Sequence, residues 1–264
     1  MTNTTSNIQN ASKTVGTLAH QPKKIKDTFA GVAVRLRKIT DLVKEFTEAE
    51  DLPEIAISMG NVKMGDVPSV SLPPVLACPN CSECFAQCYF IRNCCMYPRV
   101  LKAVARNLAL YRRRPFTNFN EVARFCLQPK SKKDPAIKHD AFRWHVGGDI
   151  PDAEYFNLMV EVAKECEGTT FLAFTKNYKV INEYLQSGKK IPSNLRVIFS
   201  AWPGAEMENP FNMPTSSPLF VDGTSAQTDN KTVHLCGGNC RKCFETGTGC
   251  WTLKEGEAVV FPAH

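Results

Sequence analysis

The chain from Phe142 to Ser200 reads FRWHVGGDIPDAEYFNLMVEVAKECEGTTFLAFTKNYKVINEYLQSGKKIPSNLRVIFS. Its three apolar runs, FRWHV, TFLAF and LRVIFS, are rich in aromatic and aliphatic residues and predict strands. The residues between these runs have helical spacing, which predicts helices over 152–166 and 179–188, the first of them capped by Asp152. Because strands that alternate with helices at this spacing form βαβ units, the segment predicts an α/β fold with a parallel sheet.

Polar or glycine residues follow the predicted strands: Gly147-Gly148-Asp149, Thr175-Lys176, Ser200 and, after a later strand, Cys236-Gly237-Gly238. The carboxyl ends of parallel strands meet at one rim, where ligands bind, so we expect these residues to converge. No helix is predicted between Ser200 and Leu219, which argues against a complete eight-stranded barrel. We therefore expect a partial or irregular (β/α) barrel with the cysteine clusters at the carboxyl-terminal rim of its strands.

The rest of the chain adds shorter elements. These are helices over 38–50, 98–114 and 118–127, extended runs over 54–74, and short strands over 219–222 and 232–235. Residues 1–22 are polar and rich in Thr, Asn and Ser, which predicts a disordered arm. Residues 23–264 are expected to form a single α/β domain.

Composition limits the class of protein. The 264 residues are 43% apolar, enough for one large core. No run approaches the roughly 18 apolar residues of a membrane span and no signal peptide is apparent, so we expect a cytoplasmic protein without membrane attachment. Twelve cysteines in a reducing compartment indicate metal or redox chemistry rather than disulfides. The net charge of +6 is explained more simply by a solvated face than by nucleic-acid binding, which stays open.

The first cysteine group consists of Cys78, Cys81, Cys84 and Cys88, in the run CPNCSECFAQC. Its spacing, C-x2-C-x2-C-x3-C, is that of bacterial ferredoxins, in which short gaps wrap consecutive thiolates around a cluster. Backbone amides of such a loop can also donate to the sulfurs. In ferredoxins the fourth cysteine ligates a different cluster, so Cys88 could point away from the other three.

The second cysteine group consists of Cys236, Cys240, Cys243 and Cys250. Its first three members have the C-x3-C-x2-C spacing with which radical S-adenosylmethionine enzymes hold a four-iron cluster that leaves one iron open. Those enzymes carry the triplet after their first strand, whereas here it lies late in the chain. Cys250 could also fill the fourth position and close the cluster.

Zinc is the alternative metal, because four thiolates at short spacing also suit a structural zinc site. We favour iron–sulfur clusters, one or two of the 4Fe–4S type, because triply repeated short gaps resemble ferredoxin runs more than paired zinc knuckles. Cys126 and Cys166 lie on helical patterns and are expected in the core. Cys94 and Cys95 are adjacent to the first cysteine group and stay open as further ligands.

Further site candidates follow the strands. His145 is a candidate proton carrier, although a buried core histidine explains it equally well. Asp149 and Lys176 could orient a polar ligand, the alternatives being a helix cap and a solvated lysine. Gly147 and Gly148 permit close approach of a cofactor. Together with Asp149 they resemble the Gly-Gly-Glu segment with which radical S-adenosylmethionine enzymes hold the amino group of their cofactor.

Several sequence blocks carry a family resemblance: SMGNVKMGDVPSVSLPP, CPNCSECFAQCY, FRWHVGGDIPD, FTKNY, VIFSAWPG, CGGNCRKCFETGTGCW and VVFPAH. In this order, over residues 55 to 264, they resemble the phage-associated gene product 88 family of bacteriophages and mobile elements. The resemblance implies a cysteine-rich protein with a shared site built from both cysteine groups, His145, Asp149 and Lys176. It implies no particular reaction.

These features favour an iron–sulfur protein that acts as a redox or radical-S-adenosylmethionine-like enzyme. Its partners would be an unidentified small-molecule substrate or an electron donor, and S-adenosylmethionine is a candidate second cofactor. In that scheme Asp149 and Lys176 orient the ligand and His145 handles protons. The alternative is a non-enzymatic zinc or iron–sulfur module of a phage or mobile element that binds nucleic acid through the basic helix around Arg106 to Arg114.

Overall fold

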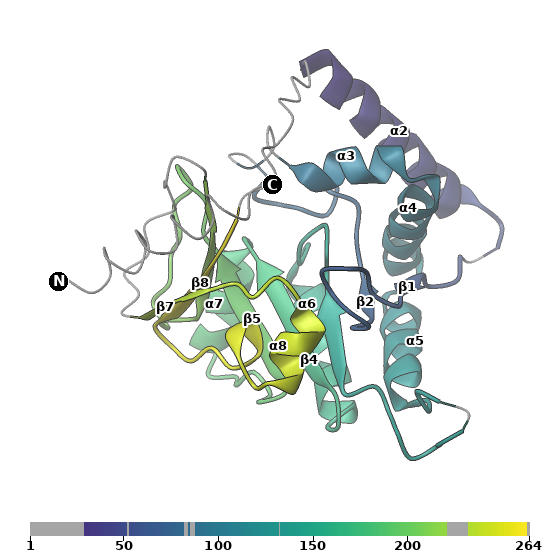
Figure 1. The fold of residues 1–264 in the computed structure, drawn as a ribbon. Coiled ribbons are helices and arrows are strands. Elements are labelled where there is room, and N and C mark those ends of the chain that lie inside the picture. Colours follow the sequence, from purple (N-terminus) through teal and green to yellow (C-terminus); the bar gives the residue numbers. More distant parts are fainter. Residues whose placement is uncertain are drawn as a thin grey trace.

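A computed structural model describes residues 29–51, 53–81, 84, 88–131, 133–220 and 232–262 (Figure 1). The predicted arm over residues 1–22 lies outside the described residues. Within the described part of the chain, no helix is both long enough and apolar enough to cross a membrane.

One sheet forms the centre of the protein, in the strand order β1-β2-β3-β4-β5-β6-β8-β7. The strands are β1 (Ile57–Ser58), β2 (Ser69–Val70), β3 (Ala141–Trp144), β4 (Thr170–Thr175), β5 (Leu195–Ser200), β6 (Thr215–Leu219), β7 (Thr232–Leu235) and β8 (Glu257–Pro262). The β1–β2 pair is antiparallel and the other pairs are parallel. The predicted α/β class and parallel sheet are therefore confirmed. Among the described strands β1 and β7 are the edges, so these strands do not close into a complete barrel.

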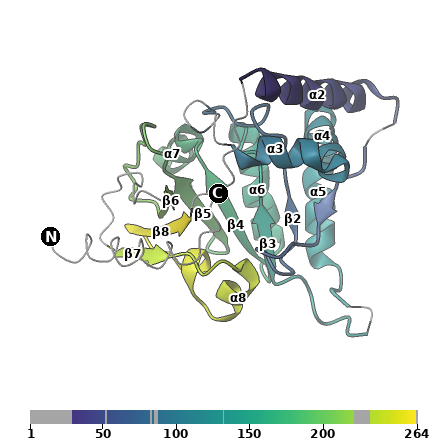
Figure 2. The same cartoon turned by 45° about the horizontal axis from the view of Figure 1, so that its top comes forward.

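Helices cover the sheet. They are α2 (Phe29–Glu48), α3 (Tyr89–Met96), α4 (Pro98–Arg113), α5 (Pro115–Leu127), α6 (Ala153–Glu165), α7 (Tyr178–Gln186), α8 (Cys240–Glu245) and the 3-10 helix η2 (Gly249–Trp251). Figure 1 shows α2 to α5 gathered beside β1 and β2, with α8 over the central strands, and Figure 2 shows α8 well apart from α2 to α4. The four helices predicted between residues 98 and 188 are confirmed, including the Asp152 cap, which accepts from the Tyr155 amide at 2.8 Å.

The two faces of the sheet bury different side chains. Phe142 and Trp144 of β3 belong to the main core, where the Trp144 and Tyr155 ring centres lie 6.3 Å apart. Ala141 belongs to a smaller core on the opposite face. Since successive side chains of a strand alternate between faces, Arg143 lies on the same face as Ala141. This second face is the one that the second cysteine group covers.

Some elements differ from prediction. The first helix begins at Phe29 rather than near residue 38, and β6 begins at Thr215, ahead of the strand predicted over 219–222. Four elements were not predicted: α3, α8, η2 and β8. The short helix α8 buries none of its residues fully, and a helix of this length is stable only through contacts with the rest of the protein.

Candidate metal centre

The first cysteine group lies on a loop that is held against the carboxyl ends of β3 and β4. The Asp149 amide donates to the Ala77 carbonyl at 3.2 Å. Asn80 Nδ2 donates to the Lys176 carbonyl at 2.6 Å. These bonds place the loop at the edge of the sheet where ligands bind in parallel α/β proteins.

The thiols of the first cysteine group interact with one another. The Cys81 thiol hydrogen-bonds with those of Cys78 and Cys84, and the bond with Cys78 is the main cause that raises the pKa of Cys81 to about 12. The hydrogen bond with Cys81, followed by burial, raises the pKa of Cys84, which the charge of Lys176 opposes. Burial raises the pKa of Cys88. The free thiols of Cys81, Cys84 and Cys88 therefore hold their protons at neutral pH, whereas a coordinated metal would deprotonate them.

Asp149 is a buried carboxylate whose oxygens accept hydrogen bonds from the protein itself. It accepts from the Ile150 amide at 2.7 Å, from Thr175 Oγ1 at 2.6 Å and from the Lys176 amide at 2.9 Å. Burial raises its pKa, and these three donors oppose that rise. Asp149 thus ties the segment after β3 to the end of β4, directly beside the loop of the first cysteine group. Its predicted contact with a ligand stays a prediction.

Lys176 extends from the end of β4 towards β5. Its Nζ donates to Ser200 Oγ at 3.2 Å and lies 5.5 Å from the ring centre of Trp202. Its charge also lowers the pKa of Cys84 and Cys88. The ammonium group therefore lies near enough to the first cysteine group for its charge to act on these two thiols.

Other residues of the protein fill the positions that side chains on Gly147 and Gly148 would take. A Cβ on Gly147 would overlap the ring of Phe90. Gly148 has a φ of +83°, and a Cβ there would lie 2.6 Å from the carbonyl oxygen of Leu72. The close approach that both glycines permit is thus made by Phe90 and Leu72. This gives the pair a packing role, and the predicted cofactor contact of Gly147 and Gly148 stays a prediction.

We expect the substitution Gly148→Ala to destabilise the protein beyond the roughly 1–2 kcal/mol that a left-handed alanine costs, because the new methyl group also clashes with backbone. The matched control is Gly188→Ala. Gly188 has a φ of +79°, and no atom lies within 4 Å of the position that its new methyl group would take, so this variant carries the conformational cost alone. Urea unfolding midpoints measure both variants, and equal losses would contradict the packing role.

His145 lies away from the thiols. Its Nε2 is 3.0 Å from Tyr155 Oη in the main core, and its backbone has a φ of +66°. Burial lowers its pKa to about 3, so the imidazole is neutral at physiological pH. The alternative of a buried core histidine therefore fits, and the structure gives no support to the predicted role in proton transfer.

The second cysteine group packs over the second face of the sheet. The Cys236 amide donates to the Val260 carbonyl of β8 at 2.8 Å. The Cys240 amide donates to the Lys63 carbonyl at 2.9 Å, and Trp251 Nε1 donates to the Cys240 carbonyl at 2.9 Å. All four thiols of the group lie against the small core of this face. The prediction that both cysteine groups share one rim is therefore not confirmed.

The thiols of the second cysteine group also influence one another. Burial raises the pKa of Cys250 to about 12, and the other three thiols add to this rise. Burial likewise raises the pKa of Cys240, with smaller contributions from Cys236 and Cys243. Arg143 opposes the rise at both Cys240 and Cys250. Arg143 is thus the cation that acts on Cys240 and Cys250 of this group.

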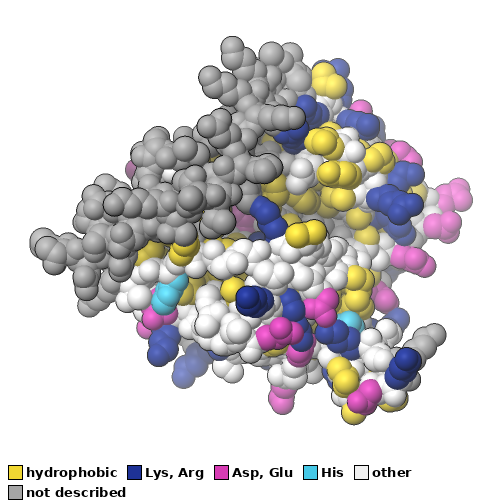
Figure 3. Space-filling view, viewed as in Figure 1, with side chains coloured by type: hydrophobic (Ala, Val, Ile, Leu, Met, Phe, Trp, Pro, Cys, Tyr) yellow, Lys and Arg dark blue, Asp and Glu magenta, His cyan; other side chains and the backbone are white. Residues whose placement is uncertain are grey.

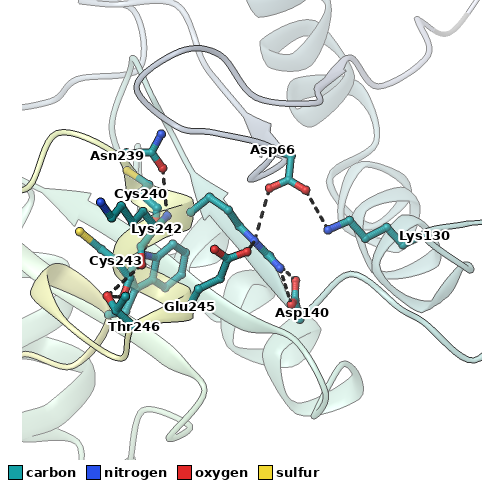
Figure 4. A network of polar contacts seen from close by, with 11 residues as sticks. Asp66, Lys130, Asp140, Asn239, Cys240, Lys242, Cys243, Glu245 and Thr246 are labelled. Carbon is teal, nitrogen blue, oxygen red and sulfur yellow. Dashed lines mark hydrogen bonds and ion pairs between the residues drawn. The ribbon is translucent and has the colours of Figure 1, made fainter.

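Arg241 fixes α8 to the amino end of β3. Figure 4 labels its acidic partners Asp66, Asp140 and Glu245. Its Nη1 and Nη2 donate to the two carboxylate oxygens of Asp140 at 2.6 and 2.9 Å, and its Nε donates to Glu245 at 2.8 Å. Asp66 lies 3.4 Å from the same Nε and also accepts from Lys130 at 2.9 Å. Because Arg241 lies between two cysteines of the group, this network holds the thiols in place.

We expect Arg241→Met to destabilise the protein by about 1–2 kcal/mol, because a mostly buried arginine loses its bidentate ion pair and the half-exposed carboxylates of Asp140 and Glu245 lose their partner. The control Arg124→Met removes an ion pair at 2.9 Å whose arginine is 65% exposed, and should cost less than about 0.5 kcal/mol. Urea unfolding measures both. Similar losses in the free energy of unfolding of Arg241→Met and Arg124→Met would contradict the anchoring role of Arg241.

The fit of a metal can be judged from the donors, since all eight cysteines are among the described residues. In the described part of the chain, no three Cys, His, Asp or Glu side chains converge closely enough to hold a single metal ion. The geometry therefore does not confirm the predicted metal sites. The donor chemistry fits an iron–sulfur cluster, because each group supplies four thiols and a cluster spreads its ligands over several iron atoms.

The remaining four cysteines lie elsewhere. Cys126 and Cys166 are buried in the main core, as predicted, and their thiols hydrogen-bond with each other. Cys94 is buried in a third core beneath α2, α3 and α4. The Cys95 thiol lies 3.8 Å from the Arg35 carbonyl, to which it donates. Cys95 therefore turns towards α2.

A family model described as gene product 88 matches residues 36–214. The chain belongs to the gene product 88 family. The match covers more than half of the chain, including the first cysteine group, Asp149 and Lys176, and ends before the second cysteine group. No curated protein and no solved structure matches the chain.

Three residues of this gene product 88 protein were not singled out from the sequence although they hold the candidate sites together: Asn80, Arg143 and Arg241. Arg143 had a usable signal, because a charged residue inside an otherwise apolar strand is uncommon unless it is paired. No signal in the sequence marked Asn80 or Arg241, because polar residues between closely spaced cysteines are common. Their partners lie far away in the sequence.

Proposed function

We propose that this gene product 88 protein is an iron–sulfur protein in which each cysteine group holds a cluster, and that it acts as a redox or radical-S-adenosylmethionine-like enzyme on a small molecule. The observation that carries the proposal is the gathering of four thiols at each of two places in one α/β domain. Four thiolates at ferredoxin spacing are the usual ligands of a 4Fe–4S cluster.

A cluster bound there would supply one electron, or an open iron, to a substrate or to S-adenosylmethionine. Residues of the chain would bind and orient the ligand. Lys176, held between Ser200 and Trp202, offers its ammonium group to an anionic substituent of the ligand beside the first cysteine group. Asp149 fixes the amide of Lys176 and thereby the direction of its side chain. The open parallel sheet would then serve as an incomplete barrel of the radical-enzyme type.

Nucleic-acid binding is less well supported. Arg113 of α4 donates to the carbonyls of Asp51 at 2.9 Å and Glu50 at 3.2 Å, so its guanidinium binds within the fold. Arg106 of the same helix lies 4.0 Å from the Glu54 carboxylate. Two arginines of the predicted basic helix are thus engaged by the protein itself, and we propose redox chemistry ahead of nucleic-acid binding. Figure 3 shows lysine and arginine side chains interspersed with acidic and hydrophobic ones on the face in view, without a continuous basic stripe.

Anaerobic purification followed by iron, zinc and acid-labile sulfide analysis tests the proposal. We expect iron and sulfide in equal amounts, and an EPR signal after reduction with dithionite. Zinc without sulfide would contradict it. Incubation of the reduced protein with S-adenosylmethionine then tests the radical mechanism, because such an enzyme releases methionine and 5′-deoxyadenosine, whereas a simple redox protein leaves the compound intact.

A further inference from the structure

Arg143 is the charged side chain that β3 directs towards the second cysteine group. Its Nη1 donates to Cys240 Sγ at 3.7 Å and to Met64 Sδ at 3.3 Å. The guanidinium carbon lies 4.8 Å from the ring centre of Phe174, and the Nε–H is buried without a hydrogen-bond partner among the described residues. The contacts described for Arg143 are thus sulfur atoms and an aromatic ring.

This environment is unfavourable for a cation unless negative charge lies next to it. Neutral thiol and thioether sulfurs are weak acceptors, and a buried donor without a partner costs free energy. The positive charge of Arg241, which follows Cys240 in the chain, is balanced by the carboxylates of Asp140, Asp66 and Glu245. The contacts described for Arg143 include no carboxylate.

We propose that Arg143 is a positioning residue that supplies the positive counter-charge and N–H hydrogen bonds for an anionic cluster held by the second cysteine group. This inference rests on the proposed function, because the negative charge would come from the thiolates and sulfides of that cluster. Thiolate and sulfide sulfurs are stronger acceptors than thiols, so they would also satisfy the unpaired Nε–H.

The arrangement has an electrochemical consequence. Nearby positive charge and hydrogen bonds to the sulfurs stabilise the reduced, more negative state of a cluster and raise its reduction potential. Arg143 should therefore make the second cluster easier to reduce. The first cysteine group has a different cation near its thiols, Lys176, which follows β4 rather than lying on β3.

Three variants of the full chain, purified anaerobically, test this inference: Arg143→Met, Arg143→Lys and the control Arg196→Met. Arg196 is exposed and lies on β5 of the same sheet. A reductive titration with dithionite as electron donor, followed by EPR, gives the midpoint potential of each cluster. The signal of the second cluster is the one that Cys240→Ala removes.

We expect Arg143→Met to weaken electron binding by the second cluster at least about tenfold, which lowers the midpoint of a one-electron couple by about 59 mV. Arg143→Lys should give a smaller shift, because the charge remains while the planar fork is lost. Arg196→Met should leave both midpoints unchanged.

The outcomes separate the two proposals. Loss of iron from a folded Arg143→Met protein, with iron retained in Arg143→Lys, would also support the role of the charge. Unchanged midpoints in both Arg143 variants would overturn the inference while leaving the iron–sulfur proposal intact. Wild-type protein without iron and sulfide would overturn the proposed function and this inference with it.

Discussion

Replacement of Cys240 by alanine should remove one of the two proposed clusters and leave the other in place. Cys240 is the first residue of α8 and its thiol is the one that Arg143 contacts, so its loss opens the second cysteine group. The first cysteine group lies at the carboxyl ends of β3 and β4 and keeps its own thiols together. Iron and sulfide content, together with the EPR spectrum of the reduced protein, measure the effect.

Two further variants complete this experiment. Cys81→Ala should remove the other cluster, because the Cys81 thiol lies between those of Cys78 and Cys84. Cys126→Ala is the control, since Cys126 is buried in the main core away from both groups and its loss should leave the iron content unchanged. Full iron content in both Cys240→Ala and Cys81→Ala would rule out these groups as cluster ligands.

Replacement of Asp149 by alanine is expected to lower the free energy of unfolding by about 3 kcal/mol or more. The substitution leaves two backbone amides and the Thr175 hydroxyl without their acceptor in a site that is 6% exposed. Each buried donor left unpaired costs about 1–3 kcal/mol, and these costs are not fully additive. Urea unfolding monitored by circular dichroism measures the loss.

The control for this variant is Asp134→Ala. Asp134 is an exposed aspartate that accepts from the Ala136 amide at 3.1 Å, so its loss should cost less than about 1 kcal/mol. Asp149→Asn keeps the shape of the side chain and one acceptor oxygen. Its loss in free energy of unfolding should lie between those of Asp149→Ala and Asp134→Ala. A small effect of Asp149→Ala with loss of iron from the first cysteine group would instead assign Asp149 to the ligand rather than to the fold.

The central α/β unit could be predicted because its elements obey local rules. Trp144 and Phe142 alternate with smaller or polar residues along β3, Asp152 caps α6, and Pro98 opens α4. Each of these signals lies within a few residues of the element that it defines. The parallel pairing then follows from the alternation of strands and helices.

The direction of His145 could not be predicted, because it depends on one unusual backbone angle. Strict alternation along β3 would place His145 on the face opposite Trp144, with Arg143 and the second cysteine group. Its φ of +66° interrupts that alternation and directs the imidazole to Tyr155 in the main core. Such an angle is uncommon outside glycine, so no pattern in the sequence indicated it.

The position of the second cysteine group in the fold could not be predicted from the sequence either. Its spacing could be read directly, but its place over the face of the sheet depends on contacts of α8 with Lys63, Met64 and Asp140. These partners lie far earlier in the chain. Local patterns carry no information about pairings of this kind.

The anchoring of α8 also dictates an order of assembly. The first cysteine group and the strands that support it, β2 to β5, are complete once residue 200 has left the ribosome, whereas Cys240 and Arg241 are synthesised later and then bind Lys63 and Asp140. Domains fold as the chain emerges, and distant pairings close late. The nascent protein therefore passes through a stage in which the first cysteine group is in place. At that stage the face of the sheet that carries Ala141 and Arg143 is not yet covered by α8 and the second cysteine group. The metal that we propose for the second cysteine group would have to be delivered after α8 and the residues around it have been translated.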